Sequence, residues 1–232
     1  IWNVSYPILL ALLAQNVINV TDTAFLGHVG EVELGASAMG GLLYICIFTV
    51  AFGFSTGSQI MIGRRNGEGR FRDVGPVMMQ GCLFLLVMAA VLFGLCQWSM
   101  PTIVRMLISS DNIYDATCEF LHWRMFGFFF SFVNVMFRAL YVGITRTKVL
   151  TLNAVIMALV NVFLDYALIF GHFGFPEMGL KGAAIASVAA EASSFVFGMV
   201  YTWIYVDLKK YGLNRWPQWD SALLGRILSI SC

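Results

Sequence analysis

A few carboxylate and amide side chains interrupt segments of this chain that are otherwise apolar. Asp22 ends an apolar run that also carries Gln15 and Asn19. Asn161 and Asp165 lie four residues apart in a second apolar run. Because an ionised group is costly inside hydrocarbon, such residues in membrane helices usually face a bundle interior or a water-filled cavity. Carboxylate and amide oxygens are also hard ligands for alkali cations, so the pattern indicates a cation or proton pathway.

The first of these runs has the spacing of a polar helix face. Gln15, Asn19 and Asp22 follow i, i+4, i+7, so we expect them to line one side of a helix. Pro7 lies upstream, and a proline in a membrane helix frees a carbonyl group and permits a bend. For Gln15 and Asn19 alone, interhelical hydrogen bonding at about 0.6–2 kcal/mol each is the favoured interpretation. Asp22 is the functional candidate, although its place near the outer end of the run allows solvation.

Two later runs add further oxygen ligands. Asn161 and Asp165 share one helix face, and in the next run Ala183, Ser187 and Glu191 share another at i, i+4, i+8. Ser187 offers a hydroxyl group, and Ala183 offers a backbone carbonyl if the helix opens there. The alternative is a hydrogen-bonded clamp between helices. Since a buried carboxylate needs a partner in either case, a cation or proton site is favoured, with Glu191 as a weaker candidate that could face water at the lipid side.

Other polar or reactive residues are explained without a site. Arg124 and Arg138 lie in one apolar segment, where snorkelling of the side chain to the interface is favoured and a structural ion pair comes second. Gly53 and Gly57 form a GxxxG pair, which is typical of close helix packing. The cysteines and histidines show no CxxC or HExxH spacing, and no GxSxG or P-loop motif occurs. We therefore predict neither an enzyme nor a cofactor other than a coupling ion.

The elements that carry these residues are apolar enough to cross a membrane. Hydrophobic residues make up 59% of the 232 positions and only 12% are charged, whereas about a quarter of the residues in soluble domains are charged. Six segments are long enough to span the hydrocarbon core. They cover about 4–27, 36–63, 74–98, 117–143, 149–171 and 180–206. The sequence therefore predicts an all-α, polytopic membrane protein built as a six-helix transmembrane bundle.

Composition also divides the chain. We expect a transmembrane lobe over 1–206, a polar linker over 207–220 and the truncated start of a seventh helix over 221–232. Because the chain begins without methionine and stops inside an apolar stretch, we expect it to be part of a longer protein. Its net charge of +1 comes from basic residues spread between spans, which predicts no nucleic-acid partner.

Lysine and arginine are unevenly distributed among the loops. One set of alternate loops contains most of them, whereas the opposite loops contain Arg105 and, at a span edge, Lys181. The basic set is Arg64, Arg65, Arg70, Arg72, Arg146, Lys148, Lys209, Lys210 and Arg215. Because basic loops stay on the cytoplasmic side, we predict a multi-pass protein of the plasma or inner membrane with a cytoplasmic amino terminus.

Four short motifs, taken in order, match those of one known family. They are Pro7, Gln15 and Asp22-Thr23 before Gly27; Gly57-Ser58-Gln59-Ile60 running into Arg65-Asn66-Gly67-Glu68-Gly69; Asn161 with Asp165; and Gly179 to Ser187. Each motif alone is weak, but their order and spacing resemble those of the multidrug and toxic compound extrusion (MATE) transporters. The DinF-like branch is one subgroup to which the chain could belong.

The resemblance implies an antiporter, coupled to Na⁺ or H⁺, that exports organic and often cationic or lipophilic compounds. Members of the family have twelve helices in two six-helix lobes, so this chain would be the amino-terminal lobe. The partners implied are a small-molecule substrate, the lipid bilayer and the carboxy-terminal lobe of the same protein.

The resemblance also assigns roles to individual residues. The proton-linked rearrangement of the first helix maps onto Pro7, Gln15 and Asp22. Ser187 stands where many members have threonine, so the hydroxyl group is kept and a methyl contact is lost. The amino-lobe cation site maps onto Asp22, Asn161, Asp165, Ala183 and Ser187, and Na⁺ would be held by the side chains among them.

Two other functions compete with an antiporter. One is a flippase-like translocator of lipid-linked intermediates, and the other is a membrane scaffold that transports nothing. A flippase should have a more cationic cavity to hold an anionic headgroup, whereas the residues expected in the interior here are acids and amides. A scaffold would not need paired carboxylates inside the membrane, so the antiporter is favoured.

Overall fold

The computed structural model describes residues 2–214 and 220–231, and all regular structure among them is helical. Six helical runs are long and apolar enough to cross a membrane, which confirms the predicted number of spans. The elements are α1 (Trp2–Val29), α2 (Glu31–Gly67), the 3₁₀ turn η1 (Phe71–Asp73), α3 (Val74–Leu107), α4 (Asp111–Arg124), the 3₁₀ turn η2 (Met125–Gly127), α5 (Phe128–Gly143), α6 (Lys148–Ile169), α7 (Gly179–Tyr205) and α8 (Ser221–Ser231). The fourth span comprises α4, η2 and α5.

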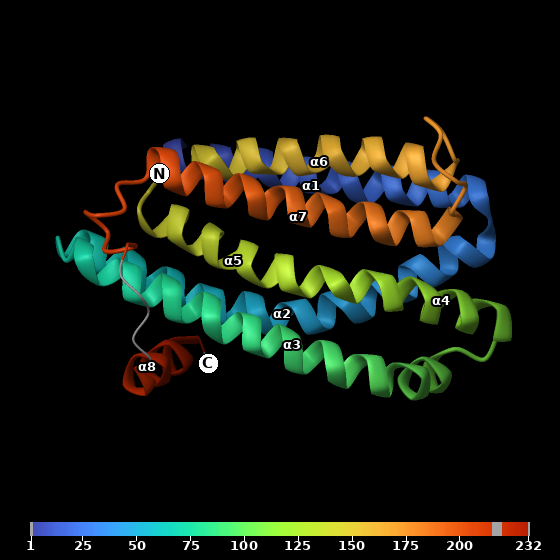
Figure 1. Cartoon of the computed structure of the whole chain (residues 1–232), viewed down its shortest axis with the longest axis horizontal. Helices are drawn as coiled ribbons and strands as arrows, with labels where there is room; N and C mark the ends of the chain where they lie inside the picture. Colours follow the sequence, from blue (N-terminus) through green and yellow to red (C-terminus); the bar gives the residue numbers. More distant parts are fainter. Residues whose placement is uncertain (1, 215–219, 232) are drawn as a thin grey trace.

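By their packing, the spans form two groups of three, which can be followed in Figure 1. In one group, α6 packs extensively against both α1 and α7. In the other, α2 and α3 pack against the α4–α5 run. The groups meet chiefly where α7 contacts α4, η2 and α5. Side chains at helix interfaces therefore lie either within one group or along the seam, the region where α7 contacts α4, η2 and α5.

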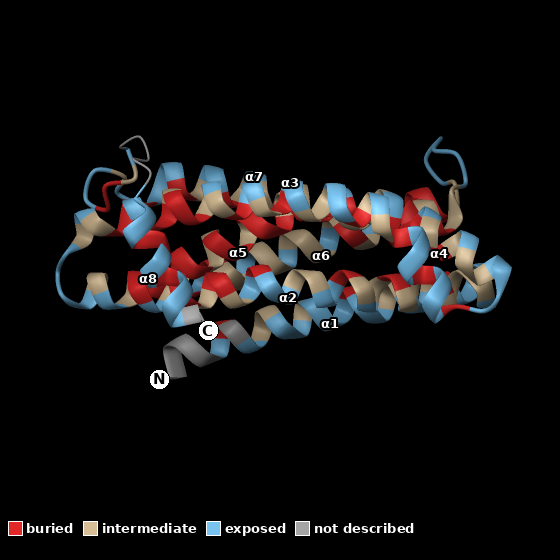
Figure 2. Ribbon diagram, turned by 90° about the horizontal axis from the view of Figure 1, so that it is seen from below, coloured by how far each residue is buried: buried red, intermediate tan, exposed pale blue. Residues whose placement is uncertain are grey.

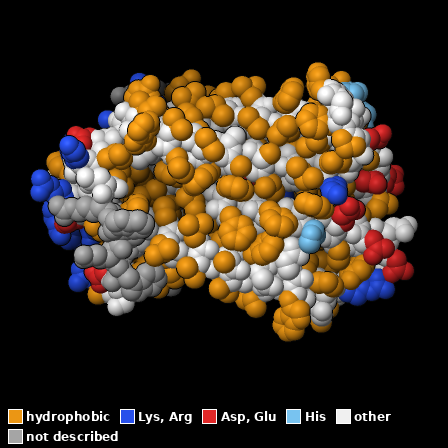
Figure 3. Space-filling view, viewed as in Figure 1, with side chains coloured by type: hydrophobic (Ala, Val, Ile, Leu, Met, Phe, Trp, Pro, Cys, Tyr) orange, Lys and Arg blue, Asp and Glu red, His pale blue; other side chains and the backbone are white. Residues whose placement is uncertain are grey.

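The core is apolar and lies mainly in the second group. Phe128 and Phe132 of α5 are fully buried, as are Ile62 of α2 and Leu85 of α3. Figure 2 shows buried residues as stripes along the inner faces of the helices. Many large apolar side chains remain exposed on the outer faces, and hydrophobic side chains cover the middle of the face in Figure 3. Such a surface fits a protein whose solvent is lipid.

The GxxxG pair does not have its expected role at Gly53. A β-carbon added there would meet no atom within 4 Å, so no helix of the described residues packs closely at this position. Close approach occurs elsewhere on the same helix, where a β-carbon added to Gly143 of α5 would lie 3.1 Å from the backbone nitrogen of Gly63. Close packing through small residues therefore occurs on α2 at Gly63, and Gly57, the other member of the pair, is buried.

Alternation of the spans gathers the basic loops at one end. The amino terminus lies at the same end as the α2–α3 and α5–α6 connections and the segment that follows α7 (Figure 1). This is the end that carries Arg64 to Arg72, Arg146, Lys148, Lys209 and Lys210, whereas Arg215 lies outside the described residues. The basic loops predicted from the sequence therefore lie together at one end of the bundle. The side of the membrane that each end faces stays a prediction.

The segment after α7 returns to the bundle. The backbone nitrogen of Gly75 donates a hydrogen bond of 2.7 Å to the carbonyl oxygen of Tyr211. Leu223, Leu224 and Ile227 of α8 are buried, and α8 packs against α2 and α3. The division into a lobe, a linker and the start of a seventh span stays a prediction, and residues 215–219 of that linker lie outside the described part.

Candidate functional site

Two of the predicted carboxylates meet inside the first helix group. Asp22 of α1 and Asp165 of α6 lie close enough for their carboxyl groups to interact. Asp165 has no exposed surface, and Asn161, one turn away on α6, is 1% exposed. The i, i+4 spacing of Asn161 and Asp165 puts both on the side of α6 that is buried. Residues far apart in the sequence are therefore combined in one polar site, in which Asp165 and Asn161 are buried and Asp22 is partly buried.

Most polar atoms of this site have no hydrogen-bond partner. Both carboxylate oxygens of Asp165, the amide oxygen and nitrogen of Asn161, and Oδ1 of Asp22 are buried and unbonded. Nearly all buried polar groups in proteins are paired, and leaving one unpaired costs about 1–3 kcal/mol. The two carboxyl groups interact, yet no hydrogen bond of normal geometry joins them. A proton or a hard cation would satisfy this oxygen cluster, so the residues fit the coupling ion that the sequence predicts.

The acceptor atoms available at the site are oxygen atoms. Among the described residues, no three His, Cys, Asp or Glu side chains come together as a metal site. A cation between Asp22 and Asp165 would therefore have two acidic groups and would need neutral oxygens such as that of Asn161. Oxygen-only donors of this kind suit alkali cations better than transition metals.

α7 runs alongside the site, although the structure does not open it. Met178 donates a backbone hydrogen bond of 2.9 Å to Leu168, and a β-carbon added to Gly182 would come within 2.7 Å of that same carbonyl oxygen. Because α6 and α7 are antiparallel, this contact places the stretch from Ala183 to Ser187 at the depth of Asn161 and Asp165. Ala183 is buried, but α7 is helical throughout, so the helix does not open there as the sequence interpretation required. The role of Ala183 and Ser187 as ligands stays a prediction.

The polar face of α1 is only partly turned inward. Gln15, which was expected in the interior, is exposed, and so is Asn19. The buried positions of α1 include Ile18 and Leu26, and a step of one residue rotates a side chain by about 100°. Gln15 and Asn19 thus lie beside the packing stripe, and Asp22 is the member of the trio that reaches α6.

Pro7 lies at a contact between α1 and α6. The hydroxyl group of Thr151 donates a hydrogen bond of 2.8 Å to the Pro7 carbonyl oxygen. The helix is continuous from Trp2 to Val29, so Pro7 does not break it. The predicted capacity of α1 to bend stays a prediction, and the Thr151 hydrogen bond is a contact that such a bend would have to accommodate.

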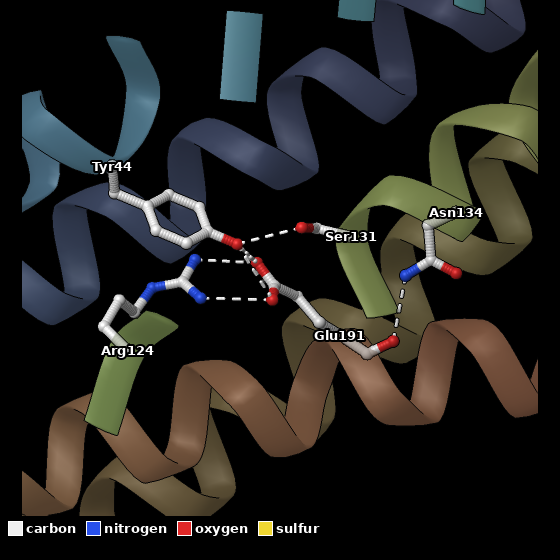
Figure 4. A network of polar contacts seen from close by, with 5 residues as sticks. All are labelled: Tyr44, Arg124, Ser131, Asn134 and Glu191. Carbon is white, nitrogen blue, oxygen red and sulfur yellow. Dashed lines mark hydrogen bonds and ion pairs between the residues drawn. The ribbon is translucent and has the colours of Figure 1, made fainter. Parts of the chain in front are cut away.

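A second polar site joins the two helix groups (Figure 4). Arg124 donates two hydrogen bonds to the carboxylate of Glu191, of 2.7 and 3.1 Å. The Tyr44 hydroxyl group donates to the same carboxylate at 3.1–3.2 Å and lies 3.0 Å from the hydroxyl oxygen of Ser131. Asn134 donates a hydrogen bond of 2.9 Å to the backbone carbonyl of Glu191. This network connects α2, the end of α4, α5 and α7.

This network corrects the sequence interpretation of two residues. Arg124 does not snorkel to the interface and Glu191 does not face lipid, because their side chains are only 14% and 12% exposed and bind each other. Arg124 and Glu191 carry opposite charges in separate apolar segments, and this pattern favours an ion pair because a charge within the membrane needs a partner. The sequence alone did not show which of several charges would meet. Arg138, by contrast, lies against the Phe52 ring and stays partly exposed.

The network is fitted around a glycine in η2. A β-carbon added to Gly127 would lie 2.3 Å from a Glu191 carboxylate oxygen and 2.5 Å from an Arg124 nitrogen. Such distances are far below van der Waals contact, so any larger residue would displace the ion pair. The Arg124 guanidinium also lies over the Tyr44 ring, 3.8 Å from its centre. Packing and hydrogen bonding thus fix the pair together.

Comparisons with known proteins agree with this architecture. Residues 7–167 match the protein-family model described as MatE. A relative named "Probable multidrug resistance protein NorM" from Agrobacterium fabrum is 29% identical over 221 residues, which cover 93% of this chain and 47% of the relative. A protein of the same name from Rhizobium meliloti is 30% identical over 218 residues, with 93% and 46% covered. The chain therefore spans about half the length of these curated relatives, and the DinF-like branch stays a prediction.

Solved structures share the fold. A MOP superfamily transporter from Pyrococcus furiosus superposes with a TM-score of 0.86 at 19% identity, over 99% of this chain and 50% of that one. Its description says that reverse polarity of the binding pocket suggests a different function. The eukaryotic MATE transporter AtDTX14 gives a TM-score of 0.83 at 17% identity, over 99% and 49%. At such identities the likeness establishes the six-helix fold alone.

Proposed function

Because this chain belongs to the MatE family, we propose that it forms one lobe of an antiporter that exports organic compounds and is driven by Na⁺ or H⁺. Its relatives are named as probable multidrug resistance proteins, which supports export of organic compounds, and we expect these to be cationic or lipophilic. The chain covers about half of those relatives. A second, carboxy-terminal lobe would therefore complete the transporter, with substrate bound between the lobes, where transporters commonly place it.

The buried carboxyl group of Asp165 carries the proposal for coupling. It has no exposed surface and no hydrogen-bond partner, and it faces a second carboxyl group on Asp22. A polar site that served packing alone would be expected to pair its atoms. Oxygen atoms that have no partner within the protein are free to bind an exchangeable ion.

Ion exchange follows from the repulsion between two neighbouring carboxylates. Both cannot be ionised cheaply when they are this close in a weakly polar interior. A cation between Asp22 and Asp165 offsets that repulsion, with the Asn161 amide oxygen and the Ser187 hydroxyl group as neutral ligands. A proton on one carboxyl group removes the repulsion as well. Protons and Na⁺ would thus compete for one site, and Ala183 would line it beside Ser187.

α1 is the element through which we expect ion exchange to reach the substrate. It carries Asp22 and, on its exposed side, Gln15 and Asn19. Ion exchange at Asp22 would change how tightly α1 is held to α6, and Pro7 would let the first half of α1 bend. The exposed polar side of α1 would then line the path between the lobes.

The orientation proposed is that of the positive-inside rule. The end with Arg64, Arg65, Lys209 and Lys210 would face the cytoplasm, together with the amino terminus. α1 and α6 would both run outward, which puts Asp22 and Asp165 in the outer half of the membrane. The flippase-like alternative is not favoured, because the buried positive charge of Arg124 is already paired with Glu191.

The experiment is efflux by the full-length protein reconstituted in vesicles, with Na⁺ and H⁺ gradients imposed separately. Asp165→Asn keeps the shape of the side chain and removes one charge, so it should abolish efflux driven by the coupling gradient. Asp22→Asn should do the same. Asp115→Asn, the same change at an exposed position of α4, should leave efflux unchanged. Wild-type rates in either of the first two variants would show that the residue has no part in coupling.

A further inference from the structure

Side chains with soft ligand atoms meet at a cavity of about 220 Å³ between α3, α4 and η2. The residues that line it are Gln97, Met100 and Pro101 of α3, Cys118 and His122 of α4, and Met125 of η2. Four of the six carry a thiol, thioether or imidazole group. None of the six belongs to the Asp22–Asp165 site, which lies in the other helix group. The connection between α3 and α4 is at the end of the bundle opposite the amino terminus (Figure 1).

Cys118 and His122 lie one turn apart on α4. Their i, i+4 spacing puts both side chains on one face of the helix, and both border the cavity. Cys118 is partly buried and His122 is exposed, which gives an ion access to the pair from outside the bundle. A thiol and an imidazole at this spacing are two of the ligands that a transition metal needs.

Gln97 of α3 holds the His122 ring in one orientation. The Gln97 amide oxygen lies 3.0 Å from Nδ1 of the ring, and the amide nitrogen donates a hydrogen bond of 3.3 Å to the His122 carbonyl oxygen. Because an amide oxygen only accepts, Nδ1 carries the proton and Nε2 keeps its lone pair. Histidines that bind metals almost always donate the other ring N–H to an oxygen in this way, which fixes the tautomer.

Met100 and Met125 supply two thioether groups on the inner side of the cavity. They are 6% and 1% exposed, whereas Met106, further along α3, is 81% exposed. Zn²⁺ is bound by thiolate, imidazole and carboxylate groups, whereas thioethers select Cu(I). None of the six lining residues is acidic, so the cavity offers no carboxylate to a hard cation. The ligand types therefore favour a soft ion.

We propose that Cys118, His122, Met100 and Met125 bind a soft monovalent cation of the Cu(I) type. The three sulfur atoms and Nε2 of His122 would be the ligands, and Gln97 would be the positioning residue. A coordinating thiol is deprotonated, so binding would release the Cys118 proton to solvent. One thiolate then balances one monovalent ion, whereas a divalent ion would leave a net charge in a partly buried cavity. The ion would connect α3 to α4 and η2.

The test measures Cu(I) binding by the purified full-length protein, in competition with a coloured Cu(I) chelator and without oxygen. Ag⁺, a soft monovalent ion that keeps its oxidation state, is titrated in parallel by calorimetry. Cys118→Ser removes the thiolate, Met100→Leu and Met125→Leu each remove one thioether, and Gln97→Leu removes the group that holds the imidazole. Methionine and leucine have similar volumes, so these exchanges are usually tolerated in a core.

Two variants serve as matched controls. Cys46→Ser removes an exposed cysteine of α2, and Met106→Leu removes the exposed methionine of α3. Neither residue lines the cavity, so both variants should bind the ions as wild type does. The thermal unfolding temperature of every variant is recorded without metal, to show that it is folded.

We expect Cys118→Ser to bind one ion fewer than wild type. Gln97→Leu should weaken binding about 10–100-fold, as is typical for loss of a group that orients a metal ligand. Met100→Leu and Met125→Leu remove direct ligands and should weaken it at least as much. X-ray absorption of wild-type protein with one equivalent of Cu(I) should show both sulfur and imidazole neighbours. Because it needs no variant, this spectrum decides even if a variant fails to fold.

Three results would overturn the proposal. The first is equal ion binding by wild type and Cys118→Ser. The second is wild-type affinity in both methionine variants, because a thiol and an imidazole alone would then account for binding. The third is loss of Cu(I) binding in Asp165→Asn, which would place the ion at the coupling carboxylates. Failure of this proposal leaves the coupling proposal standing, since efflux and Cu(I) binding are measured separately.

Discussion

The lobe contains two buried polar sites, and they differ in how completely their atoms are bonded. At Arg124 and Glu191, every charged oxygen and the facing nitrogens take part in hydrogen bonds. At Asp165 and Asn161, the side-chain polar atoms are buried without partners. The first arrangement stabilises one structure, whereas the second is costly until a proton or cation occupies it. Both sites are buried, so the number of hydrogen bonds they make is what distinguishes the structural polar site from the proposed exchange site.

Position reinforces the difference. The bonded site spans the seam and connects four elements, so changing it should loosen the whole lobe. The unbonded site lies inside one helix group, between α1 and α6. The comparison therefore predicts large losses of stability at the seam and small ones at the carboxylates, all measurable as thermal unfolding of purified protein.

The largest effect is expected from Arg124→Ala. The variant leaves the Glu191 carboxylate buried without its cation, which typically destabilises a protein by about 3–5 kcal/mol. Arg138→Ala is the matched control, because that arginine only contacts the Phe52 ring and should contribute about 0.5–1 kcal/mol. Equal losses for the two variants would show that the seam is not specially stabilised.

Gly127→Ala should come next. Its β-carbon would be forced against the Glu191 and Arg124 side chains, and overpacking of this severity costs about 3 kcal/mol. Gly53→Ala provides the control, since a β-carbon there meets no atom within 4 Å. Greater thermal stability in Gly127→Ala than in Gly53→Ala would contradict the geometry of the seam.

A smaller loss is expected from Tyr44→Phe. The change removes the hydrogen bond to the Glu191 carboxylate and the one shared with Ser131, and it leaves the ring on Arg124 in place, for a cost of about 2 kcal/mol. The control is Tyr205→Phe, at an exposed position, which should unfold at the wild-type temperature. A loss as large as that of Arg124→Ala would mean that the hydroxyl group, not the ion pair, holds the seam.

The smallest effect on stability, zero or a slight gain, is expected from Asp165→Asn. No hydrogen bond is lost, and a group that is costly to ionise in the interior becomes neutral. The same variant should lose coupled efflux, so stability and function are expected to separate at this position. Marked destabilisation would place Asp165 with the structural network and erase the contrast between the two sites.

The sequence by itself determined the class of protein and the number of spans. Twenty-odd apolar residues in a row must be helical in lipid, because every backbone group has to be bonded within its own segment. The same reasoning identified Asp165 and Asn161 as partners on one helix face, since i, i+4 spacing is a property of a single helix. Basic residues likewise marked one set of loops, which alternation of the spans then gathered at one end.

Only the tertiary structure decided which polar residues meet. Asp22 reaches α6 while Gln15 and Asn19 remain exposed, because α1 is rotated so that Ile18 and Leu26 face its neighbours. Arg124 meets Glu191 rather than the interface because α4 and η2 pack against α7, and Gly127 of η2 has no side chain to displace the pair. Spacing along one helix fixes a face, but the direction of that face depends on packing between helices far apart in the chain, and no local pattern encodes it.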